Sequence, residues 1–121
     1  MDTRILALTL LGGIAAVPVF AQDDGQTAFN NNCRTCHTME EGDNRQGPSL
    51  AGVVGRKAGS LPDYNFSASM KQSDIVWDEA SLDQFIANPD QVVSGNSMKP
   101  YGGITDAALR KTIVEFLKKG G

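Results

Sequence analysis

Apolar residues recur at helical spacing in three segments of the chain, residues 26–38, 78–87 and 105–119. Positions three and four apart fall on one face of an α-helix, so each segment predicts a helix with one apolar side. The residues on these faces are Phe29, Cys33 and Cys36 in the first segment, Leu82, Phe85 and Ile86 in the second, and Leu109, Ile113, Phe116 and Leu117 in the third. A short helix over residues 67–72 is also predicted. No stretch alternates apolar and polar residues as a strand would, so the chain is expected to be all-α.

Residues at the segment ends set the helix boundaries that the sequence predicts. Asp78 and Thr105 are expected to cap the starts of the second and third helices, while Asn88-Pro89 and Gly120 are expected to end them. The loops that glycine, proline and polar residues predict are residues 39–48, 55–66 and 90–104. Loops of this length in so small a domain require something inside the fold to pack on.

The first 21 residues differ from the rest of the chain and predict a cleaved secretory signal peptide. Arg4 precedes an apolar run from Ile5 to Val17, and residues 19–21 form a cleavage site of the kind that signal peptidase recognises. The run is shorter than the about 20 residues that span a bilayer, so we expect no membrane insertion. Residues 22–121 would then form one mature domain, located in the periplasm.

Charge narrows the range of partners. The chain has 11 Lys and Arg against 14 Asp and Glu, which gives a formal net charge of −3. The basic residues form no run and do not alternate with aromatic residues, so we expect no nucleic-acid partner. A mature chain of about 100 residues builds only a small apolar core by itself, and chains of this size often gain stability from a disulfide, a metal or a bound group.

The chain's only two cysteines and its single histidine stand together in the sequence CRTCH, as Cys33, Cys36 and His37. A redox-active dithiol would follow a β-strand in an alternating β/α pattern, and no strand is predicted here. A structural zinc site needs four ligands, and no second cysteine or histidine pair exists. A plain disulfide is the third alternative. The spacing C-x-x-C-H favours covalent attachment of one haem c, in which the two thiols add to the porphyrin vinyl groups and the His37 imidazole binds the iron.

Haem iron accepts two axial ligands, and the chain holds no second histidine. Met39 follows His37 too closely to reach the other side of a ring, and Met70 lies at a spacing typical of a helix core. Met98 stands in a polar loop far along the chain, among glycine and proline residues, and is the favoured second ligand. A lysine ligand and an open sixth position are the alternatives.

These features resemble a class I c-type cytochrome, the small mono-haem family of mitochondria and the bacterial periplasm. The resemblance extends over nearly the whole mature chain and rests on the ordered segments GQTAFNNNCRTCHTME, QGPSLAGVVGRKAG, IVWDE, LDQFIANP, SGNSM and IVEFLKK. It implies an all-α cytochrome c fold whose loops wrap around one covalently bound haem. The first and last helices would cross near Phe29 and Phe116, and Gly25 would permit their close approach.

The resemblance also implies roles for residues outside the CRTCH motif. The backbone carbonyl of Pro48 would accept the second imidazole proton of His37, which fixes the orientation of the ring. At the positions where members of the family carry the residues that bind the buried haem propionates, this chain has Arg56, Tyr64 and Trp77. The chain departs from the mitochondrial members at Met70 and Phe85, where they often carry an asparagine and a tyrosine. Both differences remove a polar group from the expected haem environment.

The function that the resemblance implies is one-electron transfer. With both axial positions filled, no substrate reaches the iron, so we expect an electron carrier and not an enzyme. The expected donor is a quinol–cytochrome c oxidoreductase or a dehydrogenase, and the expected acceptor is a terminal oxidase, a reductase or a photosynthetic reaction centre. These redox proteins would dock transiently at the exposed haem edge of a soluble monomer. The alternatives are a haem c peroxidase or gas-binding sensor with a labile sixth ligand, and a domain that serves one fixed enzyme as a subunit.

Overall fold

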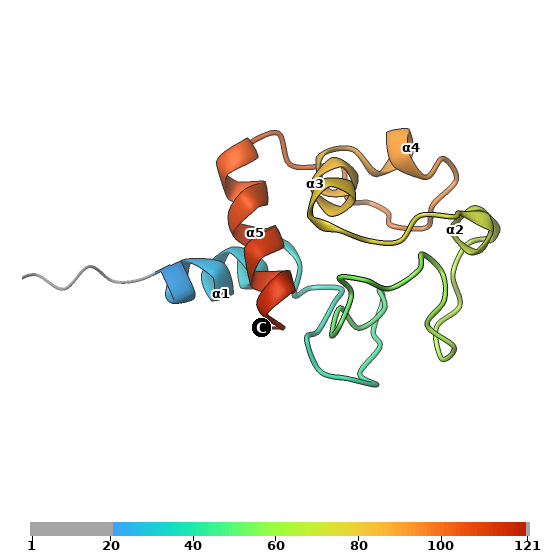
Figure 1. Ribbon diagram of the computed structural model, residues 1–121, viewed down its shortest axis with the longest axis horizontal. Helices are drawn as coiled ribbons and strands as arrows, with labels where there is room; N and C mark the ends of the chain where they lie inside the picture. The colour runs from blue at the N-terminus through green and yellow to red at the C-terminus, as the bar shows by residue number, and fades with distance from the viewer. Residues whose placement is uncertain (1–20, 121) are drawn as a thin grey trace, which may run out of the picture.

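The computed structural model describes residues 21–120, in which five α-helices are joined by loops (Figure 1). In chain order the helices are α1 (Ala21–Asn32), α2 (Ala68–Gln72), α3 (Glu79–Ala87), α4 (Pro89–Val92) and α5 (Ala107–Lys119). Within these residues the only β-type pairing is one isolated antiparallel bridge between Lys57 and Val76, so the all-α prediction is confirmed. The predicted signal peptide, residues 1–21, lies outside the described residues except for Ala21, where α1 begins.

Helices α1 and α5 pack across each other at one end of the molecule (Figure 1). The ring centroids of Phe29 on α1 and Phe116 on α5 lie 5.2 Å apart, and Ile113 on α5 has no exposed surface. A Cβ atom at Gly25 would lie 3.2 Å from the Phe116 side chain, so a larger residue there would press the two helices apart. The predicted crossing near Phe29 and Phe116, with Gly25 at the contact, is confirmed.

The predicted extent of the first helix is wrong. Helix α1 runs from Ala21 to Asn32, whereas the apolar spacing predicted residues 26–38. The helical ladder breaks at Cys33 and Arg34, because both of their amides donate to the single carbonyl of Phe29, at 2.8 and 3.1 Å. The chain then continues as a tight turn and not as a helix.

The predicted capping residue of the last helix is also wrong, by one position. Asp106, and not Thr105, caps α5, since the Asp106 carboxylate accepts from the amides of Ala108 and Leu109 at 3.0 and 3.2 Å. A carboxylate at this position is stabilised by the helix dipole in addition to its hydrogen bonds. The C-terminal prediction is confirmed, because Gly120 ends α5 in the left-handed conformation, with φ of 85°.

Helices α2 and α3 begin and end close to the predicted residues. The Asp78 carboxylate accepts from the Ser81 amide at 2.7 Å, and the Ser81 hydroxyl accepts from the Asp78 amide at 2.9 Å, so the two residues cap α3 reciprocally. After Asn88 the chain departs from the prediction of a loop over residues 90–104. Pro89 opens the single helical turn α4, where proline costs no helical hydrogen bond.

The second long loop is held against the segment that leads into α3. The Gly55 amide donates to the Trp77 carbonyl at 2.7 Å, the Trp77 amide to the Arg56 carbonyl at 3.0 Å, and the Ala58 amide to the Ile75 carbonyl at 2.8 Å. These bonds fix Arg56 and Trp77 relative to each other, although they are far apart in the sequence.

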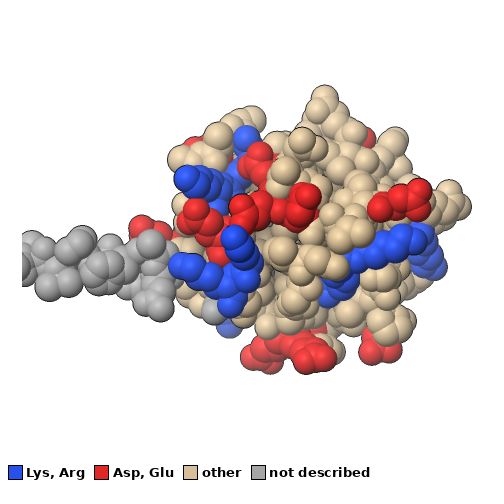
Figure 2. Space-filling view, in the orientation of Figure 1, with Lys and Arg blue, Asp and Glu red and all other residues tan. Residues whose placement is uncertain are grey.

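The surface carries charges of both signs in close proximity, as Figure 2 shows for one face of the molecule. Two ion pairs connect α5 to α3: Arg110 Nε lies 2.9 Å from an Asp83 oxygen, and Lys118 Nζ lies 2.5 Å from a Glu79 oxygen. The Lys118–Glu79 pair is exposed, and exposed pairs contribute about 0–1 kcal/mol each, whereas the Arg110 side chain is only 15% exposed. None of the helices in residues 21–120 combines the length and the apolar character needed to cross a membrane.

Candidate functional site

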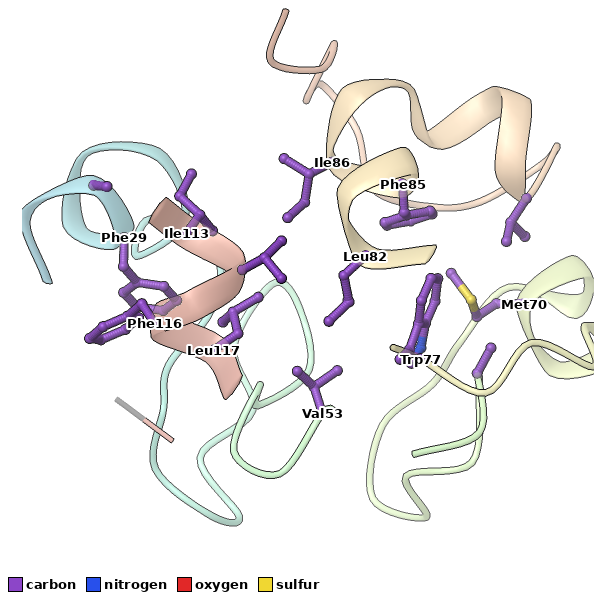
Figure 3. Close-up of a cluster of buried hydrophobic side chains, with 14 residues drawn as sticks. Phe29, Val53, Met70, Trp77, Leu82, Phe85, Ile86, Ile113, Phe116 and Leu117 are labelled. Carbon is purple, nitrogen blue, oxygen red and sulfur yellow. The ribbon is translucent and has the colours of Figure 1, made fainter. Parts of the chain in front are cut away.

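The apolar core surrounds a cavity instead of filling the centre of the fold (Figure 3). About 1310 Å³ inside its outline holds no protein atoms, including space that is open to solvent. The buried apolar residues that form its walls are Val53, Met70, Trp77, Leu82, Phe85, Ile86, Ile113 and Leu117. Ligand pockets are typically lined by apolar side chains with a few polar groups among them, and this cavity has that character.

All eight residues that the sequence predicted as site residues line this one cavity. They are Cys33, Cys36, His37, Pro48, Arg56, Tyr64, Trp77 and Met98. The fold brings them from the turn after α1, from the long segment between that turn and α2, from the segment that leads into α3 and from the loop between α4 and α5. Two thiols and an imidazole are the groups that attach and ligate haem c, and a thioether is one of its usual second ligands, so these residues around an apolar space fit that group.

The CRTCH segment forms a turn that continues directly from α1. The amides of Cys36 and His37 both donate to the Cys33 carbonyl, at 3.1 and 2.9 Å. Both cysteines are half-buried, and neither forms a disulfide. The turn therefore presents two thiols and one imidazole to the same cavity.

The environment of the cysteines argues against two of the alternatives from the sequence. Burial, assisted by the neighbouring Cys36, raises the pKa of the Cys33 thiol to about 11. A redox-active dithiol needs the opposite, since the thiolate is the reactive form. Within residues 21–120, no three His, Cys, Asp or Glu side chains converge as metal ligands, so the structure offers no support for a zinc site.

His37 is 7% exposed, and its Nδ1 donates to the Pro48 carbonyl at 2.8 Å. Because a carbonyl only accepts, the proton lies on Nδ1 and the free electron pair lies on Nε2. Burial lowers the pKa of the His37 imidazole; the Pro48 bond raises it in part, and the charge of Arg56 lowers it further. The ring is therefore neutral at pH 7 and able to act as a metal ligand.

Gly47 packs against the His37 ring and was not singled out by the sequence. A Cβ atom at this position would lie 2.3 Å from Cε1 of His37 and 2.6 Å from Nδ1, which real Cβ atoms do not approach. The Gly47 amide also donates to the Cys36 carbonyl at 2.8 Å. The signal in the sequence was the Gly-Pro pair directly before the predicted Pro48 contact, because a conformationally free residue beside a rigid one marks a close approach of chains.

The three residues predicted to meet the propionates all lie in the cavity wall and are held by the surrounding loops. Arg56 donates to two carbonyls of the loop before it, at 3.2 and 2.9 Å. The Tyr64 hydroxyl donates to the Gln46 carbonyl at 2.5 Å. Trp77 is 7% exposed and packs on Phe85, with ring centroids 5.1 Å apart. Their polar groups therefore stand in a wall that is otherwise mostly apolar.

Met98 lies half-buried at the cavity, in a loop that two further residues hold in place. The Met98 amide donates to the side-chain oxygen of Asn96 at 2.9 Å, and the Tyr101 hydroxyl donates to the Ile86 carbonyl of α3 at 2.5 Å. Neither Asn96 nor Tyr101 was predicted as a site residue. A polar residue in a polar loop gives no signal in the sequence, because only the fold reveals that Asn96 is buried.

The mouth of the cavity carries little charge. The exposed residues among those that line it are Asn32, Thr35, Gln46, Ser97, Lys99 and Pro100. Lys99 is the only charged member of this group, and its Nζ lies 2.6 Å from an Asp90 carboxylate oxygen. A molecule that approaches the mouth therefore meets mainly uncharged polar groups.

Comparison with known proteins gives consistent results for sequence and structure. The family model described as Cytochrome c matches residues 22–120. Cytochrome c2 iso-1 of Magnetospirillum fulvum is 43% identical over 96 residues, which covers 78% of this chain and 96% of that protein. Cytochrome c of Euglena viridis is 36% identical over 94 residues, 78% of this chain and 91% of that protein. Among solved structures, cytochrome cH from Methylobacterium extorquens superposes with a TM-score of 0.74 at 39% identity, covering 81% of this chain and 97% of that one.

Proposed function

Because the chain belongs to the cytochrome c family, we propose that it is a soluble periplasmic one-electron carrier whose haem iron is bound by His37 and Met98. The coarser facts follow from the family itself. The chain has the class I cytochrome c fold, binds one covalent haem c through Cys33 and Cys36, and is an electron-transfer protein and not an enzyme. Support for the periplasm is the signal-peptide pattern of residues 1–21.

The chain's own residues set the conditions for reversible electron transfer. When bound, the haem supplies an iron that alternates between the ferric and ferrous states, one electron at a time. The hydrogen bond from His37 to Pro48 orients the imidazole and makes Nε2 a stronger donor. The thioether of Met98 and the apolar walls favour the less charged ferrous state, so both raise the reduction potential. Arg56, Tyr64 and Trp77 would supply the partners of the propionate groups.

Redox partners would dock at the mouth of the cavity, where the chain leaves the bound group closest to solvent. Because the one charged residue there, Lys99, is paired with Asp90, contact would rely on uncharged groups. Transient redox complexes bury small interfaces. The donor would be a quinol–cytochrome c oxidoreductase or a dehydrogenase, and the acceptor a terminal oxidase, a reductase or a photosynthetic reaction centre.

The observation that carries the proposal is the convergence of Cys33, Cys36, His37 and Met98 on one apolar cavity. The test is to export the full chain in a bacterium that attaches haem c, and to measure the intact mass and a potentiometric titration. We expect the mass to rise by one haem, and reduction to follow a single one-electron step. The Cys33→Ala/Cys36→Ala variant should carry no covalent haem. A colourless wild-type protein would refute the proposal.

A further inference from the structure

Asn96 is 5% exposed, although it lies in the loop that joins α4 to α5. Its side-chain amide makes three hydrogen bonds. The Oδ1 atom accepts from the Met98 amide at 2.9 Å, and Nδ2 donates to the Asp90 carboxylate and to the Val93 carbonyl, both at 2.9 Å. A buried amide whose bonds were removed would leave unsatisfied polar groups, so this arrangement is strongly preferred over other positions of the loop.

Asp90 extends the same network to the other side of Met98. Its Oδ1 atom accepts from Asn96 and also from Lys99 Nζ, at 2.6 Å. The residue two positions before Met98 and the residue directly after it are therefore both attached to one carboxylate of α4. This places a helix, and not only the loop, behind the position of Met98.

The backbone amide is the part of Met98 that the protein holds by hydrogen bonding. Among the hydrogen bonds of residues 21–120, Asn96 is the only acceptor of the Met98 amide. The Met98 side chain is half-buried and packs against the core, which restrains it without fixing its direction. The direction of the side chain therefore depends on the backbone that Asn96 holds.

We propose that Asn96 is the positioning residue for the sixth iron ligand, and that it keeps Met98 at the cavity through the bond to the Met98 amide and the anchor to Asp90. The inference rests on the proposed ligation by Met98. Without Asn96 the loop spends more time with the sulfur away from its position. An external ligand competes only during that time, so its apparent affinity rises in proportion to the fraction of open protein.

The test is a titration of the ferric holoprotein with imidazole, followed through the absorption band that a thioether ligand gives at the red end of the spectrum. We expect Asn96→Ala to bind imidazole about tenfold more tightly than wild type, since the half-buried Met98 amide loses its acceptor. Asp90→Ala removes the anchor of Asn96 and the ion pair with Lys99, but it leaves the bonds of Asn96 to Val93 and Met98, so we expect a smaller rise, about twofold. Asp90 is exposed, so this variant retains the fold.

Asn44 provides the matched control. It also joins two backbone segments, since its side chain accepts from the Ser49 amide at 2.8 Å and donates to the Asp63 carbonyl at 3.2 Å, but it makes no bond to the Met98 loop. Asn44→Ala should destabilise the fold and leave imidazole affinity unchanged. If Asn96→Ala lowers the unfolding midpoint without changing imidazole affinity, or if Asn44→Ala changes that affinity equally, Asn96 has no positioning role.

The failure of this inference and that of the proposed function give different results. A wild-type ferric protein without the thioether band would overturn the ligation by Met98 itself. A wild-type protein with the band, together with equal imidazole affinities in wild type, Asn96→Ala and Asp90→Ala, would overturn only the role of Asn96. If Asn96→Ala does not fold, an unchanged affinity in Asp90→Ala counts against the proposal and a raised one supports it.

Discussion

Gly47 has no space for a side chain, because the imidazole of His37 occupies the position that a Cβ atom would take. In Gly47→Ala the new methyl group would lie 2.3 Å from Cε1 of His37, whereas ordinary contacts begin at 3.4 Å. The ring must therefore retreat by about 1.1 Å, the difference between these distances. A shift of that size disrupts the 2.8 Å bond from His37 to Pro48.

The expected loss of stability in Gly47→Ala is the sum of three terms. Overpacking costs about 1–3 kcal/mol and the lost hydrogen bond about 0.5–1.5 kcal/mol. Alanine also lowers the conformational entropy of the unfolded chain, which stabilises the folded state by about 0.4–1 kcal/mol, because Gly47 has an ordinary φ that alanine also adopts. The net loss is therefore roughly 0.5–4 kcal/mol, and displacement of the ring should also alter the ferric spectrum.

The assay is guanidinium unfolding of the haem-containing protein, read together with its ferric absorption spectrum. Gly102→Ala is the matched control, since a Cβ atom there meets nothing within 4 Å and the backbone is not left-handed. We expect the control to be neutral or slightly more stable, with an unchanged spectrum. If Gly47→Ala matches Gly102→Ala in both the unfolding midpoint and the spectrum, the packing argument around His37 is refuted.

Three further predictions concern the helix crossing, the loop after Met98 and the mouth of the cavity. Phe116→Ala removes the ring packed 5.2 Å from Phe29 and should cost about 3–5 kcal/mol in thermal unfolding; a loss below about 1 kcal/mol would contradict the crossing as the main contact. Burial raises the pKa of Tyr101 to about 12. The free energy of unfolding should therefore be at its full value below pH 10 and should fall as the pH rises towards 12. Tyr101→Phe should reduce that fall, and an identical pH profile would refute it. The rates of electron transfer to small anionic and to small cationic metal complexes should both depend only weakly on ionic strength, because Lys99 is paired with Asp90. Rates that depend strongly on ionic strength, with opposite signs for the two kinds of complex, would refute an uncharged mouth.

The chemistry of the site could be predicted from the sequence because it depends on residues that are rare in this chain. Cys33, Cys36 and His37 are the only residues of their types, and their spacing matches one covalent chemistry. Met98 was favoured as the second ligand because it is a methionine in a polar loop, where packing does not explain it, and its binding to the iron stays a prediction. All four side chains line the same cavity in the structure.

The helix boundaries were less predictable, because neighbouring residues compete for the same hydrogen bonds. Thr105 and Asp106 are both good capping residues, and only the fold decides that the Asp106 carboxylate reaches the free amides. The apolar spacing of the sequence continues through Cys33 and Cys36, although the helix ends at Asn32 and a turn follows.

The supporting residues could not be predicted, since their roles depend on contacts between distant parts of the chain. Asn96 stands in a loop that resembles any exposed polar loop, and its burial follows from the position of α4. Tyr101 is similar, because its hydroxyl reaches the Ile86 carbonyl of α3 only after the loop has folded back. Single-sequence patterns report local preference, and these contacts are not local.

The most direct test of the central claim is the ferric absorption spectrum of Met98→Ala, compared with wild type, Met39→Ala and Met70→Ala. If the iron of the covalently bound haem is ligated by His37 and Met98, the thioether band at the red end of the spectrum is present in wild type. It should persist in the Met39 and Met70 variants and be absent only in Met98→Ala. A band that survives in Met98→Ala, or one that is missing from the wild-type protein, would contradict the account.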